Sequence, residues 1–93
     1  MRYVKVVWEH DFPDDPILYL SEIGEDGYEI RKVQLYRDGR TEWADGHHET
    51  ATVGLSEIPF PPVEEISAQS GFRAELITPE EFEHAWSEAR AKT

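Results

Sequence analysis

Alternating apolar and polar positions in the first half of the chain predict a series of β-strands. Residues 2–10 carry valine and aromatic residues at both parities, which is typical of a central strand covered on both faces. Residues 17–23 and 28–37 are also rich in apolar residues and predict two further strands, and the Asp38-Gly39 turn predicts a fourth at residues 40–43. Residues 11–16 separate the first two strands and contain two prolines and three aspartates. They predict a structured turn, because proline fixes φ and aspartate bonds its own backbone.

Two Asp-Gly pairs set the expected registers of the hairpins, because this dipeptide favours tight two-residue turns. With a turn at Asp26-Gly27, the expected neighbours across the strands are Glu22 with Arg31, Leu20 with Val33, Leu18 with Leu35, and Ile23 with Ile30. With a turn at Asp38-Gly39, they are Arg37 with Arg40, Tyr36 with Thr41, and Gln34 with Trp43.

These registers give the expected sheet two apolar faces. One face carries Leu18, Leu20, Val33 and Leu35. The other carries Ile17, Tyr19, Ile23, Ile30, Tyr36 and Trp43. Each face therefore needs its own cover. The pattern leaves open a β-bulge near Arg31-Lys32, which would change the phase and redistribute the side chains between the faces.

The second half of the chain predicts shorter elements. Residues 44–54 are polar and predict a loop or a weak edge strand. Residues 58–62 contain three prolines and must be extended, because the residue before a proline avoids the helical region. Residues 63–69 are compatible with a short helix, and residues 72–77 predict a short strand.

A C-terminal amphipathic helix is the clearest element in the pattern. Thr78 is the expected N-cap, followed by Pro79 and by Glu81 three residues after the cap. The apolar stripe of the helix is Phe82, Ala85, Trp86 and Ala89. We therefore expect one α+β domain over residues 1–93, with an antiparallel sheet of four to five strands packed against this helix. The pattern does not show which face the helix covers, and we expect the segment 58–69 to cover part of the other.

Composition narrows the class of protein. The chain has 93 residues, 39% of them apolar, which is enough for one core, and it has no cysteine, which excludes disulfides and thiolate chemistry. The apolar stretch at the N-terminus is too short for a signal peptide, and no stretch approaches the length of a membrane span. We expect a bacterial-style cytoplasmic protein.

The net charge of −11 is unevenly distributed. Residues 9–29 contain eight acids and no Lys or Arg, and residues 56–88 contain eight acids against one Arg. Between them, residues 31–40 have four cations against one acid. This field opposes binding to nucleic acid and to anionic membranes, and it favours encounter with a basic protein. The competing interpretation is an ordinary solvated surface whose charges neutralise one another across the strands.

His10, Asp11, Asp14 and Asp15 are the first candidate site. Carboxylates beside an imidazole can bind a divalent metal ion or transfer protons. The spacing is not that of a calcium loop, since the required glycine and distal glutamate are missing. The competing interpretation is a turn in which the aspartates bond backbone amides, and we prefer it.

Other candidate sites carry less weight. His47 and His48 are adjacent, so an extended chain would point them to opposite faces. His84 lies between glutamates at helical spacing, which predicts a solvated ion pair. The serines lie in no nucleophile elbow and the glycines do not have phosphate-loop spacing. We therefore expect no catalytic residues, no metal ion and no cofactor.

The string Trp-x-His-Asp-Phe-Pro-Asp-Asp-Pro at residues 8–16 resembles a family of small bacterial proteins known only as domain-of-unknown-function family 6881. The resemblance continues through Tyr-Arg-Asp-Gly-Arg at residues 36–40 and Trp-Ala-Asp at residues 43–45, and it ends in the Glu-Phe-Glu helix at residues 81–83. It covers nearly the whole chain. It implies a bacterial single-domain protein and no particular activity.

These observations favour a protein-binding module over an enzyme. We expect an immunity-like or antitoxin-like inhibitor that places its acidic surface against a basic partner. The expected contact residues are His10, Asp11, Asp14, Asp15, Tyr36 and Trp43. The alternative is a small ligand-binding or metal-binding protein, or an enzyme, that uses His10, Asp14 and Asp15. The protein could be a monomer, or a homodimer formed through a spare sheet face.

Overall fold

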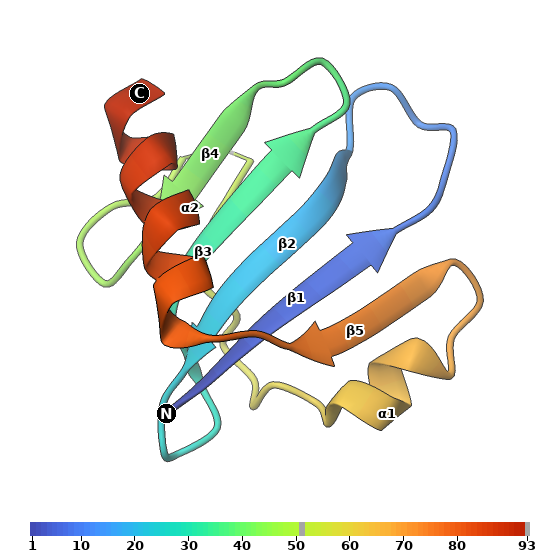
Figure 1. Ribbon diagram of the computed structural model, residues 1–93, viewed down its shortest axis with the longest axis vertical. Coiled ribbons are helices and arrows are strands. Elements are labelled where there is room, and N and C mark those ends of the chain that lie inside the picture. Colours follow the sequence, from blue (N-terminus) through green and yellow to red (C-terminus); the bar gives the residue numbers. More distant parts are fainter. Residues whose placement is uncertain (51, 93) are drawn as a thin grey trace.

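The computed structural model describes residues 1–50 and 52–92, and within them the chain forms an antiparallel sheet with helices packed on its faces (Figure 1). The strands are β1 (Arg2–Trp8), β2 (Pro16–Ile23), β3 (Glu29–Tyr36), β4 (Thr41–Ala44) and β5 (Phe72–Leu76). The helices are α1 (Val63–Ser67) and α2 (Pro79–Lys92). The strand order is β4-β3-β2-β1-β5, so β1 is an interior strand as its apolar character predicted. The α+β prediction is confirmed.

The β2–β3 hairpin has the predicted register over most of its length. Glu22 pairs with Arg31, Leu20 with Val33, and Leu18 with Leu35, as expected. The turn itself is one residue longer than predicted. Pairing begins at Gly24 instead of Glu25, because the Gly24 N–H bonds the Tyr28 carbonyl at 2.9 Å. A bulge between Glu29 and Arg31 absorbs the extra residue of the turn. Ile23 consequently pairs with Glu29, and the predicted pairing of Ile23 with Ile30 is wrong.

The predicted register of the β3–β4 hairpin is wrong by one residue. The Tyr36 N–H bonds the Arg40 carbonyl at 2.9 Å, so the loop contains three residues and ends at Gly39, whose φ is 91°. Three-residue loops of this kind place glycine in the left-handed region. No bulge compensates within the described pairs of β3 and β4, so Trp43 lies opposite Val33 instead of Gln34. A shift of one residue moves each side chain of a strand to the other face, and Trp43 and Tyr36 therefore lie on opposite faces.

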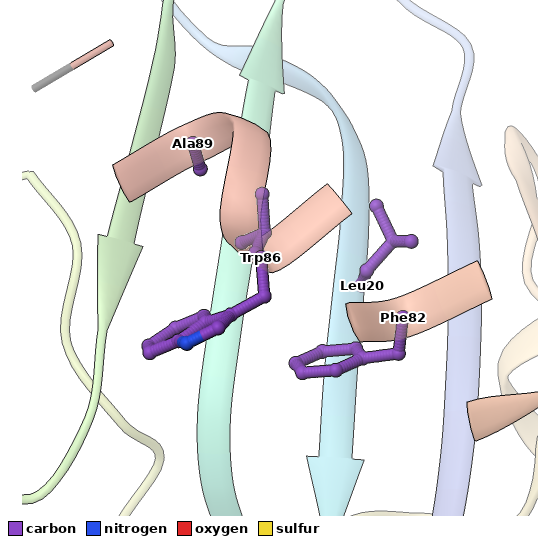
Figure 2. Close-up of a cluster of buried hydrophobic side chains, with 5 residues drawn as sticks. Leu20, Phe82, Trp86 and Ala89 are labelled. Atoms are coloured by element: carbon purple, nitrogen blue, oxygen red, sulfur yellow. The ribbon is translucent and has the colours of Figure 1, made fainter. Parts of the chain in front are cut away.

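Helix α2 covers one face of the sheet, over β2, β3 and β4 (Figure 1). Its predicted stripe is confirmed: Figure 2 shows Phe82, Trp86 and Ala89 directed toward the sheet, beside Leu20. Trp43 belongs to this cluster and meets Trp86 edge-on, with 5.2 Å between ring centroids. The helix begins as predicted, with the Glu81 N–H bonded to the Thr78 hydroxyl at 3.1 Å.

The opposite face is covered by α1 and the proline-rich segment that precedes it. Its core contains Val4, Val6, Ile23 and Ile66, with Phe60 packed against them. The Phe60 N–H bonds the Gly27 carbonyl at 2.7 Å, which fastens the segment to the β2–β3 turn. The second cover was expected from the sequence, and the structure confirms it. For residues 44–54 the sequence predicted a loop or a weak edge strand. Ala44 ends β4, and residues 45–50 and 52–54 form a loop with one isolated bridge between Asp45 and His48, while position 51 lies outside the described residues.

Candidate functional site

The loop between β1 and β2 is built on a stack of aromatic rings. The His10 ring lies 3.9 Å from the Trp8 ring and 5.5 Å from the Phe12 ring, between centroids. Its Nδ1 accepts a hydrogen bond from the Phe12 N–H at 3.0 Å. Because Nδ1 is an acceptor in the neutral ring, the proton is on Nε2, which donates to the Pro16 carbonyl at 2.8 Å. The His10 ring therefore fixes the positions of Phe12 and Pro16, on either side of the turn.

A neighbouring hairpin also holds this loop. The Arg37 guanidinium, in the β3–β4 loop, donates a hydrogen bond to the His10 carbonyl. The Asp15 N–H approaches the Phe12 carbonyl at 3.5 Å and closes a turn within the loop. Residues 10–16 are thus tied at several points, which lowers the conformational entropy that binding a partner would cost.

The surface of this loop is acidic and has an apolar tip. Asp11, Asp14 and Asp15 are exposed, and across residues 1–50 and 52–92 none of the three carboxylates forms an ion pair. Phe12 is 59% exposed between them. We define this acidic loop as residues 10–15.

The structure brings Tyr36 close to the acidic loop but not Trp43. Tyr36 and Asp14 line the same hollow at the end of the sheet. Tyr36 is buried, with its hydroxyl bonded to Glu42 and Gln34 and the Arg40 guanidinium 4.3 Å from its ring centroid. Tyr36 therefore forms part of the inner wall of this hollow. Trp43 lies on the α2 face instead, where its ring stacks on His48 at 3.7 Å.

The arrangement does not assemble a metal site from the predicted residues. Both nitrogens of the His10 ring are engaged in the hydrogen bonds of the loop. Among the described residues, no group of three or more His, Asp and Glu side chains has the proximity needed to hold a metal ion. The geometry therefore gives no support to the metal-binding alternative at His10, Asp14 and Asp15.

Sequence reasoning missed an aromatic pocket on the face opposite α2. The pocket has a volume of about 430 Å³ and lies between the sheet and the proline-rich segment. Four half-buried rings contribute to its lining: Trp8, Tyr19, Phe60 and Phe72. Trp8 connects the pocket to the acidic loop, because its ring contacts His10 and also lies parallel to Phe72 at 5.6 Å.

A buried ion pair also lines this pocket. The Glu29 side chain is 2% exposed, and its carboxylate lies 3.2 Å from Lys32 Nζ. It also accepts hydrogen bonds from the Ser21 hydroxyl at 2.9 Å and the Ser56 N–H at 2.7 Å. The bulge at Ile30 places this carboxylate on the pocket face of the sheet. The sequence pattern left open a bulge near Arg31-Lys32, and the structure has it one residue earlier.

A second charged network joins the sheet to α2. Arg31 Nε lies 2.6 Å from Glu22 Oε1, and the same guanidinium bonds Glu83 on the helix. The hydrogen bond from Arg31 holds the pKa of Glu22 below its ordinary value, against the opposing effect of burial. The guanidinium also lies 4.9 Å from the Phe82 ring centroid. This network stabilises the fold rather than forming an open site.

An antiparallel sheet with one long helix on one face and a proline-rich segment on the other defines a small α+β domain. Within the described ranges, no helix is both long enough and apolar enough to cross a membrane. The family model described as Domain of unknown function (DUF6881) matches residues 2–91, and the chain belongs to this family. No curated protein and no solved structure matches the chain.

Proposed function

We propose that this protein is a protein-binding module, an immunity-like inhibitor that places its acidic loop against a basic partner. The observation that supports this proposal is an exposed aromatic ring, Phe12, on a loop fixed by hydrogen bonds, set among three aspartates that form no ion pair in the described part of the chain. An aromatic anchor at the centre and a polar rim are common features of protein interfaces.

The ion pairs elsewhere in the molecule strengthen this proposal. Lys5 lies 3.5 Å from Glu75 and 3.7 Å from Glu81, and Arg73 lies 3.1 Å from Glu9. These cations offset acids outside residues 10–15. Within residues 1–50 and 52–92 no ion pair neutralises Asp11, Asp14 or Asp15, although the Arg37 guanidinium is bonded to the His10 carbonyl of the same loop. The net charge of −11 adds a long-range attraction for a basic protein.

The residues of the proposed interface take different roles. Asp11, Asp14 and Asp15 would form salt bridges at the rim, and Phe12 would enter a pocket on the partner. His10 would act as a positioning residue, because its ring nitrogens are used to shape the loop. Trp43 has no place in this interface, since it lies on the α2 face.

The proposal is tested by capturing the partner from cells with two variants of equal charge. The triple variant D11N/D14N/D15N removes three acids from the loop and changes the net charge from −11 to −8. The matched control E25Q/E57Q/E80Q makes the same change at three exposed acids that form no ion pair in the described part of the chain.

We expect the loop variant, and separately Phe12→Ala, to weaken binding of the captured partner by at least about tenfold, because each removes interactions worth about 1.4 kcal/mol or more. The control should bind almost as the parent protein does. If the loop variant and the control lost the same amount of binding affinity, net charge alone would explain the effect and the acidic loop would not be the contact site. Undiminished binding of the loop variant would contradict the proposal.

A further inference from the structure

The aromatic pocket beside the acidic loop combines incompletely buried rings with a buried carboxylate. Trp8, Tyr19, Phe60 and Phe72 line the pocket and are only half-buried, although the last three also pack against the core. The pocket also contains a buried carboxylate, Glu29, although a buried ion pair often stabilises a fold no better than apolar residues of the same size. Both features are typical of a ligand site, in which rings supply surface and a few polar groups supply direction.

We propose that this pocket receives an arginine side chain of the same basic partner that the acidic loop binds. This inference rests on the proposed function, and it adds a second point of contact to it. A guanidinium is attracted to the faces of aromatic rings, and the attraction increases when both are partly removed from water.

Glu29 and Lys32 line the pocket and offset each other, so the negative potential that favours a cation there comes from the acidic loop. Lys32 is the nearest basic group that lines the pocket, and its ammonium is bound by Glu29 at 3.2 Å and by the Gly54 carbonyl at 3.0 Å. Asp15 of the acidic loop exerts its negative potential at Tyr19, where burial and then this carboxylate raise the pKa of the tyrosine hydroxyl. Tyr19 therefore stays neutral at physiological pH and can accept a hydrogen bond from a guanidinium.

The pocket lies next to the acidic loop, so a single segment of the partner could contact both. Trp8 lines the pocket and also supports His10, so the two surfaces share one ring. A partner that contacts Phe12 would need to extend only past Trp8 to reach Phe72. Acidic loop and pocket thus form one continuous strip along the end of β1.

The test uses a free probe and no partner, so its outcome is separate from that of the proposed function. N-acetyl-arginine amide is titrated into the protein while the indole N–H signals of Trp8, Trp43 and Trp86 are followed by NMR. N-acetyl-citrulline amide, which has nearly the same shape without the charge, is the control. Trp43 and Trp86 lie on the α2 face and serve as internal references.

We expect the arginine probe to shift the Trp8 signal and to bind about fivefold more tightly than the citrulline probe, as about 1 kcal/mol of cation–π attraction would give. Phe72→Leu should abolish most of this difference, and Phe60→Leu provides the same comparison if the first variant does not fold. Equal shifts with both probes, shifts at Trp43 instead of Trp8, or no shift at tens of millimolar would each overturn the inference.

Discussion

Arg31 and Glu22 face each other across the β2–β3 pair, with Arg31 Nε 2.6 Å from Glu22 Oε1. Tyr3 also donates to this carboxylate, at 2.9 Å. The pair joins the centre of the sheet to α2, because Arg31 continues to Glu83 on the helix. These charges therefore stabilise the fold, whereas the aspartates of the acidic loop have no ion-pair partner among residues 1–50 and 52–92.

The first prediction concerns the pH dependence of stability. The pKa of Glu22 is lower in the folded protein than in the unfolded chain, where it is about 4.3, so its contribution is present above that pH and is lost as the pH falls through the folded value. We expect Glu22→Gln to cost about 2 kcal/mol at pH 7 and to reduce the loss of stability on acidification. Urea denaturation at pH 7 and pH 3.5 measures both effects. The same acid sensitivity in the variant and the parent protein would contradict this account.

The second prediction tests the three-residue loop between β3 and β4. Gly39 has a φ of 91°, so Gly39→Ala should destabilise the protein by about 1–2 kcal/mol although a Cβ would meet nothing within 4 Å. Gly46 has equally open surroundings without a positive φ, and Gly46→Ala should be neutral or slightly stabilising. Thermal denaturation of the two variants compares them directly. If Gly39→Ala were as harmless as Gly46→Ala, the loop would not have this conformation.

A third prediction concerns Thr41, which is 6% exposed. Its hydroxyl is the one buried side-chain polar atom without a hydrogen bond among the described residues. Thr41→Val replaces the hydroxyl with a methyl group of similar size, and it should stabilise the protein by up to about 1 kcal/mol. Thr41→Ser keeps the hydroxyl and removes the methyl group, so it should destabilise. Chemical denaturation of both variants provides the measurement, and the reverse order would show that the hydroxyl has a partner.

A fourth prediction concerns the outer edge of β5. The Ser67 hydroxyl accepts a hydrogen bond from the Ala74 N–H at 2.9 Å and donates to the Ala74 carbonyl at 3.2 Å. It therefore occupies backbone groups that could otherwise pair with a strand of another molecule. We expect Ser67→Ala to cost about 1 kcal/mol and to increase self-association at high concentration. Light scattering against the parent protein measures the second effect, and unchanged association would show that the edge is protected by other means.

The sequence was sufficient to predict elements whose determinants are local. The helix from Pro79 to Lys92 has its cap and its apolar stripe within one segment, and both are as expected. Turn chemistry gave the register between Glu22 and Arg31 correctly, but only because a bulge compensated for the longer turn. The loop that ends at Gly39 is also one residue longer than predicted, but no bulge compensates in the described pairs of β3 and β4. Trp43 was therefore predicted on the wrong face of the sheet.

The candidate site was predictable only in part, for a similar reason. The acidic loop is continuous in sequence, so its charges were visible in the residues themselves. The aromatic pocket joins side chains from distant segments, such as Trp8 and Phe60, and it depends on the bulge that turns Glu29 inward. Pairings of this kind follow from tertiary packing, which a local pattern does not contain.

The central claim is that the acidic loop binds a basic partner, and the association rate constant of the captured complex tests it most directly. Stopped-flow measurements between 50 mM and 500 mM salt should show a decrease of about tenfold or more for the parent protein and for E25Q/E57Q/E80Q, since salt screens electrostatic steering. The variant D11N/D14N/D15N should associate more slowly at low salt and depend less on ionic strength. An association rate that is the same at both salt concentrations would contradict the account.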